Sequence, residues 1–167
     1  MNKWSRLVGA GMIASTIVAG TVVAEQPAQA KTDTVQKPYY NYKGYTKYDG
    51  QFVLDKYFVS ALKNENFTLN GYKVAPDAKL GGEGQKSEVF DTTVVKDNKG
   101  KVSTIEFKVK EGTISKADFQ KAHKNNKLVR TTTSKAGETF LKYETKNGGY
   151  FAAFDAKGYL TGLSIYS

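Results

Sequence analysis

The chain has 167 residues, a formal net charge of +9 and no cysteine. Its length suits one ordinary domain after a leader and is too short for two. Without cysteine there are no disulfide bonds and no thiol chemistry, so packing must stabilise the fold, and 11 tyrosines with 9 phenylalanines suit a small β-rich core.

Residues 1–30 have the pattern of a secretory signal peptide. Lys3 and Arg6 give a positive start, residues 7–24 carry no charge, and Ala-Gln-Ala at 28–30 places small residues where a signal peptidase reads them. A membrane anchor is the alternative, but the uncharged run is only moderately apolar and lies near the lower length limit for a span. We expect cleavage after Ala30 and a secreted, extracellular protein, released or loosely associated with the cell surface, with no stable membrane insertion.

The next segments are expected to be a flexible lead at residues 31–37 and a single α+β domain at residues 38–167. Residues 38–48 are the most unusual stretch, with five tyrosines, two lysines and a glycine. We interpret them as a short strand followed by a turn.

Two helices are predicted. The first covers residues 54–64, where apolar side chains recur with the 3.6-residue period. The second begins after Ser115, which we expect to be its N-cap with Asp118 three residues later, and Ile114 can pack on Phe119. We expect this helix to end near residues 125–126.

Strands fill most of the remaining chain. Residues 67–69 and 72–74 flank Asn70-Gly71, a dipeptide that favours a tight hairpin. After a loop at 76–87, strands are expected at 88–95 and 102–110, joined by a turn at 96–100. A loop at 130–137 precedes a meander of strands at 139–145, 150–154 and 159–166. The predicted fold class is α+β, with two helices packed on an antiparallel sheet of about six strands.

A faint internal repeat relates residues 99–107 to residues 157–165, which both begin Lys-Gly and continue with the same apolar spacing. The two helix starts are separated by a similar number of residues. Two tandem helix-plus-meander units would explain both the spacing of the repeat and the spacing of the helix starts. The alternative is that there is no duplication, because any turn followed by a strand gives a similar residue pattern.

No constellation in the sequence favours catalysis. His123 is the only histidine, and we interpret it as a structural residue beside the apolar face of the second helix. The acidic residues show no zinc or calcium spacing, and the glycine-rich residues 81–87 lack the order of a phosphate-binding loop. We therefore expect a protein that is not an enzyme and that uses no metal and no cofactor.

The tyrosine–lysine segment is the feature that suits binding. Aromatic rings stack on exposed bases and lysines neutralise phosphates, which together allow binding with little sequence preference. Arg130 is the single arginine after residue 30, so the guanidinium group, which reads base edges with two hydrogen bonds, is nearly absent. The candidate nucleic-acid-binding residues are Lys37, Tyr42, Lys43, Tyr45, Lys47, Tyr48, Lys96, Lys99, Lys101, Lys121, Lys124 and Lys127.

Three alternatives stay open at this point. The tyrosines can be core residues of an edge strand, and the lysines can be solvated positions that keep the protein soluble. A protein-binding module, an adhesin or inhibitor with a host protein partner, would use exposed tyrosines as anchors. A cell-wall polyanion such as teichoic acid would use the same lysines as nucleic acid. Lysines gathered on one face would favour a polyanion, and lysines spread around an exposed aromatic patch would favour a protein.

The chain from residue 31 onward resembles the immunodominant staphylococcal antigen B family. The resemblance is carried by residues 38–45, 52–56, 70–75 and 114–122, and it is strongest from 37 to 75. It implies a secreted or loosely cell-associated bacterial protein, immunogenic and virulence-associated, that binds extracellular DNA or RNA without marked sequence preference. It assigns no binding residue.

Overall fold

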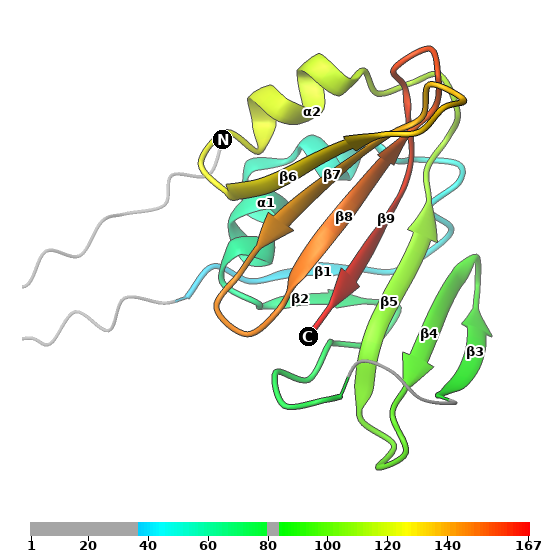
Figure 1. The fold of residues 1–167 in the computed structure, drawn as a ribbon. Helices are drawn as coiled ribbons and strands as arrows, with labels where there is room; N and C mark the ends of the chain where they lie inside the picture. Colours follow the sequence, from blue (N-terminus) through cyan, green and yellow to red (C-terminus); the bar gives the residue numbers. More distant parts are fainter. Residues whose placement is uncertain (1–36, 80–83) are drawn as a thin grey trace, which may run out of the picture. The chain divides into compact units, whose positions relative to one another are not determined.

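The main feature of the fold is a seven-stranded antiparallel sheet with the strand order β3-β4-β5-β9-β8-β7-β6 (Figure 1). The computed structural model describes residues 37–79 and 84–167. The strands of this sheet are β3 (Gln85–Val89), β4 (Thr92–Lys96), β5 (Val102–Lys108), β6 (Lys127–Thr133), β7 (Thr139–Glu144), β8 (Gly149–Phe154) and β9 (Leu160–Tyr166).

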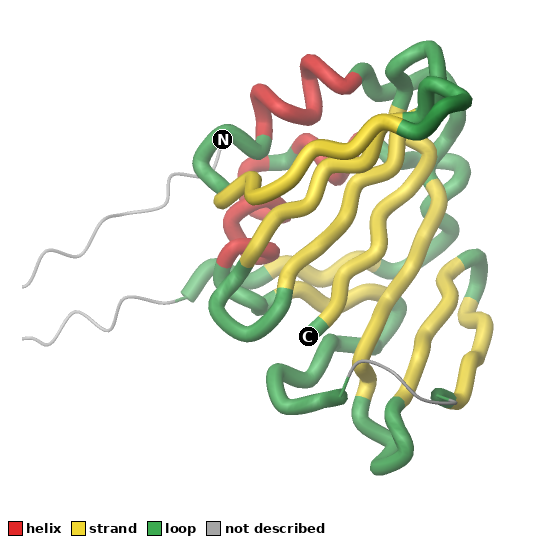
Figure 2. The backbone as a smooth tube through the Cα atoms, viewed as in Figure 1, coloured by secondary structure: helices red, strands yellow, loops and turns green. Residues whose placement is uncertain are grey.

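The helices and a small second sheet pack against one face of the main sheet (Figure 2). They are a 3-10 helix η1 (Gln51–Leu54), helices α1 (Lys56–Lys63) and α2 (Lys116–Ala122), and the parallel pair β1 (Tyr40–Tyr42) and β2 (Phe67–Leu69). One apolar core joins the two layers. Its members include Phe52, Phe58 and Leu62 from the helical layer and Ile105, Leu141 and Tyr150 from the sheet.

Local sequence explains both helix starts. The carboxylate of Asp55 accepts a hydrogen bond from the Tyr57 amide at 2.6 Å, which caps α1. Ser115 caps α2 as predicted, because its Oγ accepts from the Asp118 amide at 3.0 Å. The α2 helix ends at Ala122, earlier than predicted. No helix within the described ranges is long and apolar enough to cross a membrane.

The predicted α+β class, with two helices and an antiparallel sheet, is confirmed. Three details of the prediction are wrong. Asn70 and Gly71 form the expected tight turn, with φ of 52° and 88°. The predicted hairpin does not continue, because a single bridge between Leu69 and Tyr72 flanks the turn and β2 pairs in parallel with β1. The predicted strand at 88–95 is broken by a turn at Phe90, where φ is 56°, and becomes β3 and β4. The first half of the predicted loop at 130–137, residues 130–133, belongs to β6.

Strand β6 is an edge strand, and all seven of its residues are exposed. Its pairing with β7 shifts register between Leu128 and Arg130, which marks a bulge. The predicted signal peptide, nearly all of the predicted lead and residues 80–83 lie outside the described residues.

The two halves of the fold are arranged alike. Each helix is followed by an antiparallel meander, and the last strands of the meanders, β5 and β9, pair at the centre of the sheet. The turns before these strands share one geometry, in which Oδ1 of Asp97 or Asp155 accepts from the amides two and four residues later. This arrangement agrees with two tandem helix-plus-meander units.

Candidate nucleic-acid interface

The face of the main sheet that points away from the helices carries no helix or strand of the described residues (Figure 1). We call it the open face. Strand pairing lines up one row of side chains across it, formed by Glu106, Ser164, Phe151, Lys142 and Arg130. Phe151 is 37% exposed, and Phe140 on the neighbouring strand is 38% exposed.

An aromatic pair with a cation above it lies at the centre of this row. The rings of Phe151 and Tyr166 are stacked, with centroids 5.2 Å apart and an interplanar angle of 28°. The Lys142 Nζ lies 5.4 Å from the Phe151 centroid and 5.8 Å from the Tyr166 centroid, which is cation–π geometry. We call these three residues the aromatic platform.

Gly149 allows Tyr166 to lie flat on the sheet. A Cβ at position 149 would approach the Tyr166 hydroxyl to 2.8 Å and the Tyr143 carbonyl oxygen to 2.3 Å, and neither distance is tolerable. The Tyr166 hydroxyl is buried and has no hydrogen-bond partner among the described residues.

Two adjacent hollows lie on the open face, and Phe151 of the platform lines the larger one. The larger has a volume of about 870 Å³ and is lined by residues that include Lys47, Lys108, Lys110, Phe140 and Phe151. The smaller, of about 370 Å³, shares Lys47 and Lys108 with it and reaches Phe90. An extended ligand could therefore contact the sheet from the platform to the segment around Lys47.

Three exposed rings form a second aromatic group at the far end of the hollows. Tyr45, Tyr48 and Phe90 are 51%, 79% and 55% exposed, and we call them the aromatic cluster. The Tyr45 ring packs edge-on against Phe90 at 5.0 Å and against Tyr48 at 5.9 Å. Such a group of exposed rings is typical of an interaction surface.

Thr46 fixes this segment to the sheet. Its side chain is fully buried, its Oγ1 donates to the Lys108 carbonyl at 2.7 Å, and its amide donates to Asp91 at 2.9 Å. The Lys47 amide donates to the second oxygen of the same carboxylate at 2.8 Å. These bonds hold Tyr45 and Lys47 in place beside the hollows.

The charges of the open face are mixed. The bases along the two hollows and the central row are Lys47, Lys108, Lys110, Lys142 and Arg130, and the acids are Glu88, Asp91, Glu106, Glu111 and Glu138. Aromatic contacts therefore outweigh net charge as the distinguishing feature of this face.

Of the sequence-predicted residues, Lys47 lines both hollows of the open face. Tyr45 and Tyr48 belong to the aromatic cluster, whose third ring, Phe90, lines the smaller hollow. Lys43 is exposed in the same segment. Tyr42 does not present a free ring face, because its ring stacks on Phe52 with centroids 4.2 Å apart. The expectation that strand tyrosines pack in the core holds for this residue.

The other predicted lysines are distributed over several regions. Lys101 pairs with Asp77 and Lys127 pairs with Glu144, while Lys96 lies over the Tyr72 ring at 5.7 Å. The remaining ones are exposed: Lys99 in the β4–β5 turn, Lys121 on α2, Lys124 just after α2, and Lys37 at the start of the described chain. Lysines thus lie on both layers and do not gather on one face, so by the criterion set from sequence the placement of these lysines alone does not favour a polyanion.

The sequence reasoning missed Phe90, Phe140, Lys142, Phe151 and Tyr166. The alternation of residues 139–145 and 150–154 contains a signal, since Phe140, Lys142 and Phe151 fall on the side opposite to Leu141 and Tyr150. Cross-strand register, which the sequence does not specify, then places them beside one another.

His123 is a structural residue, as predicted, and it is fully buried. Its Nε2 donates to the Val53 carbonyl at 2.9 Å, so Nδ1 accepts from the Tyr150 hydroxyl at 2.8 Å. The Asn126 side chain donates to the same hydroxyl at 2.8 Å. Burial lowers the pKa of His123 to about 4, although the bond to the Val53 carbonyl opposes this. No group of three or more potential metal ligands occurs within the described ranges.

A sequence model of the immunodominant staphylococcal antigen B family matches residues 39–165. The chain belongs to this family. Proteins named immunodominant staphylococcal antigen B from Staphylococcus aureus strains USA300 and COL are each 31% identical to it over 147 residues, which cover 86% of this chain and 82% of the relative. No solved structure matches the chain significantly. The resemblance inferred from sequence is thus confirmed.

Proposed function

We propose that this protein is a non-catalytic, extracellular binder of single-stranded nucleic acid with little sequence preference, and that the strand binds on the open face. The observation that carries the proposal is the position of Lys142 above the stacked rings of Phe151 and Tyr166. Stacked bases and neutralised phosphates are the two contacts that sequence-tolerant single-strand binding requires.

The size and chemistry of the open face support an extended strand. Aromatic rings on the surface of a sheet can stack on bases, as in common RNA-binding modules. Lys47, Lys108 and Lys110 along the hollows can reach phosphates. Because Arg130 is the only arginine among the residues that the structure describes, base-edge readout should be weak. A duplex keeps its bases stacked inside and gains nothing from the rings, so we propose that it binds less well.

The comparisons support an exposed location. The relatives are named as immunodominant antigens, and an antigen must be accessible to the immune system of the host. Membership of this antigen family also supports a role in virulence.

The test is fluorescence anisotropy with a labelled oligothymidine and a duplex of equal length. We expect Phe151→Ala to weaken single-strand binding about 5- to 150-fold, because one base stack contributes ~1–3 kcal/mol, and to leave duplex binding nearly unchanged. The matched control is Tyr57→Ala, since Tyr57 lies on α1 with Lys56 4.9 Å above its ring. Equal losses in the two variants, or no loss in Phe151→Ala, would reject the open face as the binding site.

The aromatic cluster favours a second candidate function, the binding of a host protein. Its rings are more exposed than those of the platform, and the exposed Lys43 and Lys47 lie in the same segment as Tyr45 and Tyr48. Tyrosines of this kind are common anchors at protein interfaces. If Tyr48→Ser leaves nucleic-acid affinity unchanged but abolishes adhesion to immobilised host proteins, the cluster serves this second function.

A further inference from the structure

A second groove, separate from the open face, is lined by four lysines. Its volume is about 380 Å³, and the lysines come from four different segments of the chain. They are Lys37 before β1, Lys63 at the end of α1, Lys73 after β2 and Lys146 in the β7–β8 turn. We call this hollow the lysine groove.

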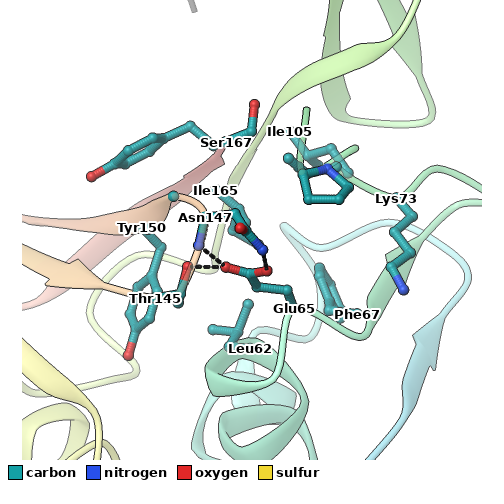
Figure 3. Close-up of a pocket in the computed structure, with 15 residues that line it drawn as sticks. Leu62, Glu65, Phe67, Lys73, Ile105, Thr145, Asn147, Tyr150, Ile165 and Ser167 are labelled. Carbon is teal, nitrogen blue, oxygen red and sulfur yellow. Dashed lines mark hydrogen bonds between the residues drawn. The ribbon is translucent and has the colours of Figure 1, made fainter. Parts of the chain in front are cut away.

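Glu65 is the one acidic residue among those lining the groove, and its carboxylate is already bound. One oxygen accepts from Thr145 Oγ1 at 2.7 Å and from the Asn147 amide at 2.5 Å, and the other accepts from Asn147 Nδ2 at 2.6 Å (Figure 3). Burial would raise the pKa of Glu65, but these bonds and the charge of Lys146 outweigh it, so the pKa is lowered. Glu65 therefore stays ionised and neutralises one lysine at most.

The lysines have no other acidic partner within the described ranges. The ion pairs there, Lys101 with Asp77 and Lys127 with Glu144, leave the groove lysines out. The single side-chain bond from a groove lysine runs from Lys73 Nζ to the neutral amide oxygen of Asn66, at 2.9 Å. About three positive charges thus remain around one hollow without a counter-charge.

The wall behind the groove limits what can bind. Leu62, Phe67, Ile105 and Ile165 line an apolar pocket behind Glu65 and Lys73 (Figure 3). The pocket holds about 30 Å³, which is room for roughly two water molecules and not for an acyl chain or a ring. A ligand of the groove therefore gains nothing from an apolar group, and the groove volume of about 380 Å³ suits a small polar anion.

We propose that the lysine groove binds an oligophosphate, a compact anion of three or more charges. Lysine is a mobile point charge and a common phosphate ligand, and several ammonium groups around one hollow match clustered phosphate oxygens better than a single carboxylate. Free inorganic oligophosphate and the triphosphate group of a nucleotide share this chemistry. The groove shares no residue with the two hollows of the open face, so this inference does not depend on the proposed function.

The test is calorimetric titration of the protein with sodium tripolyphosphate, ATP and AMP, with amide chemical shifts followed by NMR. We expect tripolyphosphate and ATP to bind at least about tenfold more tightly than AMP, with the largest shifts at Lys63 and Asn147. The double variant Lys63→Ser/Lys146→Ser should lose about tenfold or more in affinity for tripolyphosphate. Tighter binding of ATP than of tripolyphosphate would identify a nucleotide as the source of the phosphates.

The matched control is Lys121→Ser/Lys124→Ser, which removes the same charge from the exposed surface at and just after α2. It should bind tripolyphosphate as the parent protein does. An equal loss in both double variants would show that net charge alone attracts the ligand and would overturn the proposal. So would shifts confined to the open face, or equal affinities for AMP and tripolyphosphate.

Discussion

The buried hydroxyl of Tyr150 donates a 2.8 Å hydrogen bond to Nδ1 of His123, whose other ring nitrogen is held by the Val53 carbonyl. This network needs a neutral imidazole, because a protonated Nδ1 could not accept. The folded protein therefore resists protonation of His123, and the unfolded chain does not. The bond links the stability of the fold to pH.

We expect the free energy of unfolding to rise with pH between about 4 and 6.5 and to level off above that range. The pKa of His123 is about 4 in the folded protein and near 6.5 in the unfolded chain, so the unfolded state binds more protons in this window. The full effect is about 3 kcal/mol. Urea unfolding at several pH values measures it, and His123→Phe should flatten this part of the curve. A parent protein equally stable at pH 4.5 and 7 would contradict the assignment.

Gly149→Ala should damage both the fold and the aromatic platform. The new methyl group would lie within 2.3 Å of the Tyr143 carbonyl oxygen and 2.8 Å of the Tyr166 hydroxyl, so the backbone and the Tyr166 ring must shift. We expect a loss of about 2 kcal/mol or more in stability and weaker single-strand binding. Gly158→Ala is the control, because its Cβ would meet nothing within 4 Å and only its φ of +83° is strained. Thermal melting measures the stability of both variants, and fluorescence anisotropy measures their single-strand binding.

Salt dependence should separate charge from stacking on the open face. For single strands the logarithm of affinity falls with the logarithm of salt by about 0.7 per phosphate neutralised. Lys47→Ser/Lys142→Ser should flatten that slope by up to about two phosphate-equivalents, whereas Phe151→Ala should lower affinity and keep the slope. Affinity titrations at four salt concentrations measure this. An unchanged slope in the double lysine variant would remove both lysines from the phosphate contacts.

Glu65→Ala should loosen the junction between α1 and the β7–β8 turn. It removes a carboxylate that accepts three hydrogen bonds from Thr145 and Asn147, and partial exposure limits the cost to about 1–3 kcal/mol. Chemical denaturation measures the loss. Glu111→Ala, at an exposed position, should change stability by less than about 0.5 kcal/mol. Equal stabilities of the two variants would mean that the Glu65 bonds contribute nothing net.

Local chemistry explains which parts of the fold were predictable. Ser115 and Asp118 fixed the start of α2 because a cap acts within four residues of chain. The turn at Phe90 was not predictable, since a phenylalanine with positive φ has no local signal and is held by its surroundings. Strand β6 escaped prediction for another reason. It is exposed along its whole length, so it shows no alternation of apolar and polar residues.

The candidate interface was predictable only in part. Tyr45 and Lys47 stood out because they lie in one unusual segment. Phe151, Tyr166 and Lys142 come from three strands, and only cross-strand register brings them together. Tyr42 looked equivalent to Tyr45 in sequence, yet one ring stacks on Phe52 and the other is exposed.

The exposed edge of β6 has a consequence for the protein at high concentration. An edge strand with free backbone groups and exposed Leu128 and Val129 can pair with a strand of another molecule and start an aggregate. The charges of Lys127 and Arg130 and the bulge between Leu128 and Arg130 oppose such pairing. These features act as gatekeepers, and a chain that lost both charges would be prone to assemble edge to edge into fibrils.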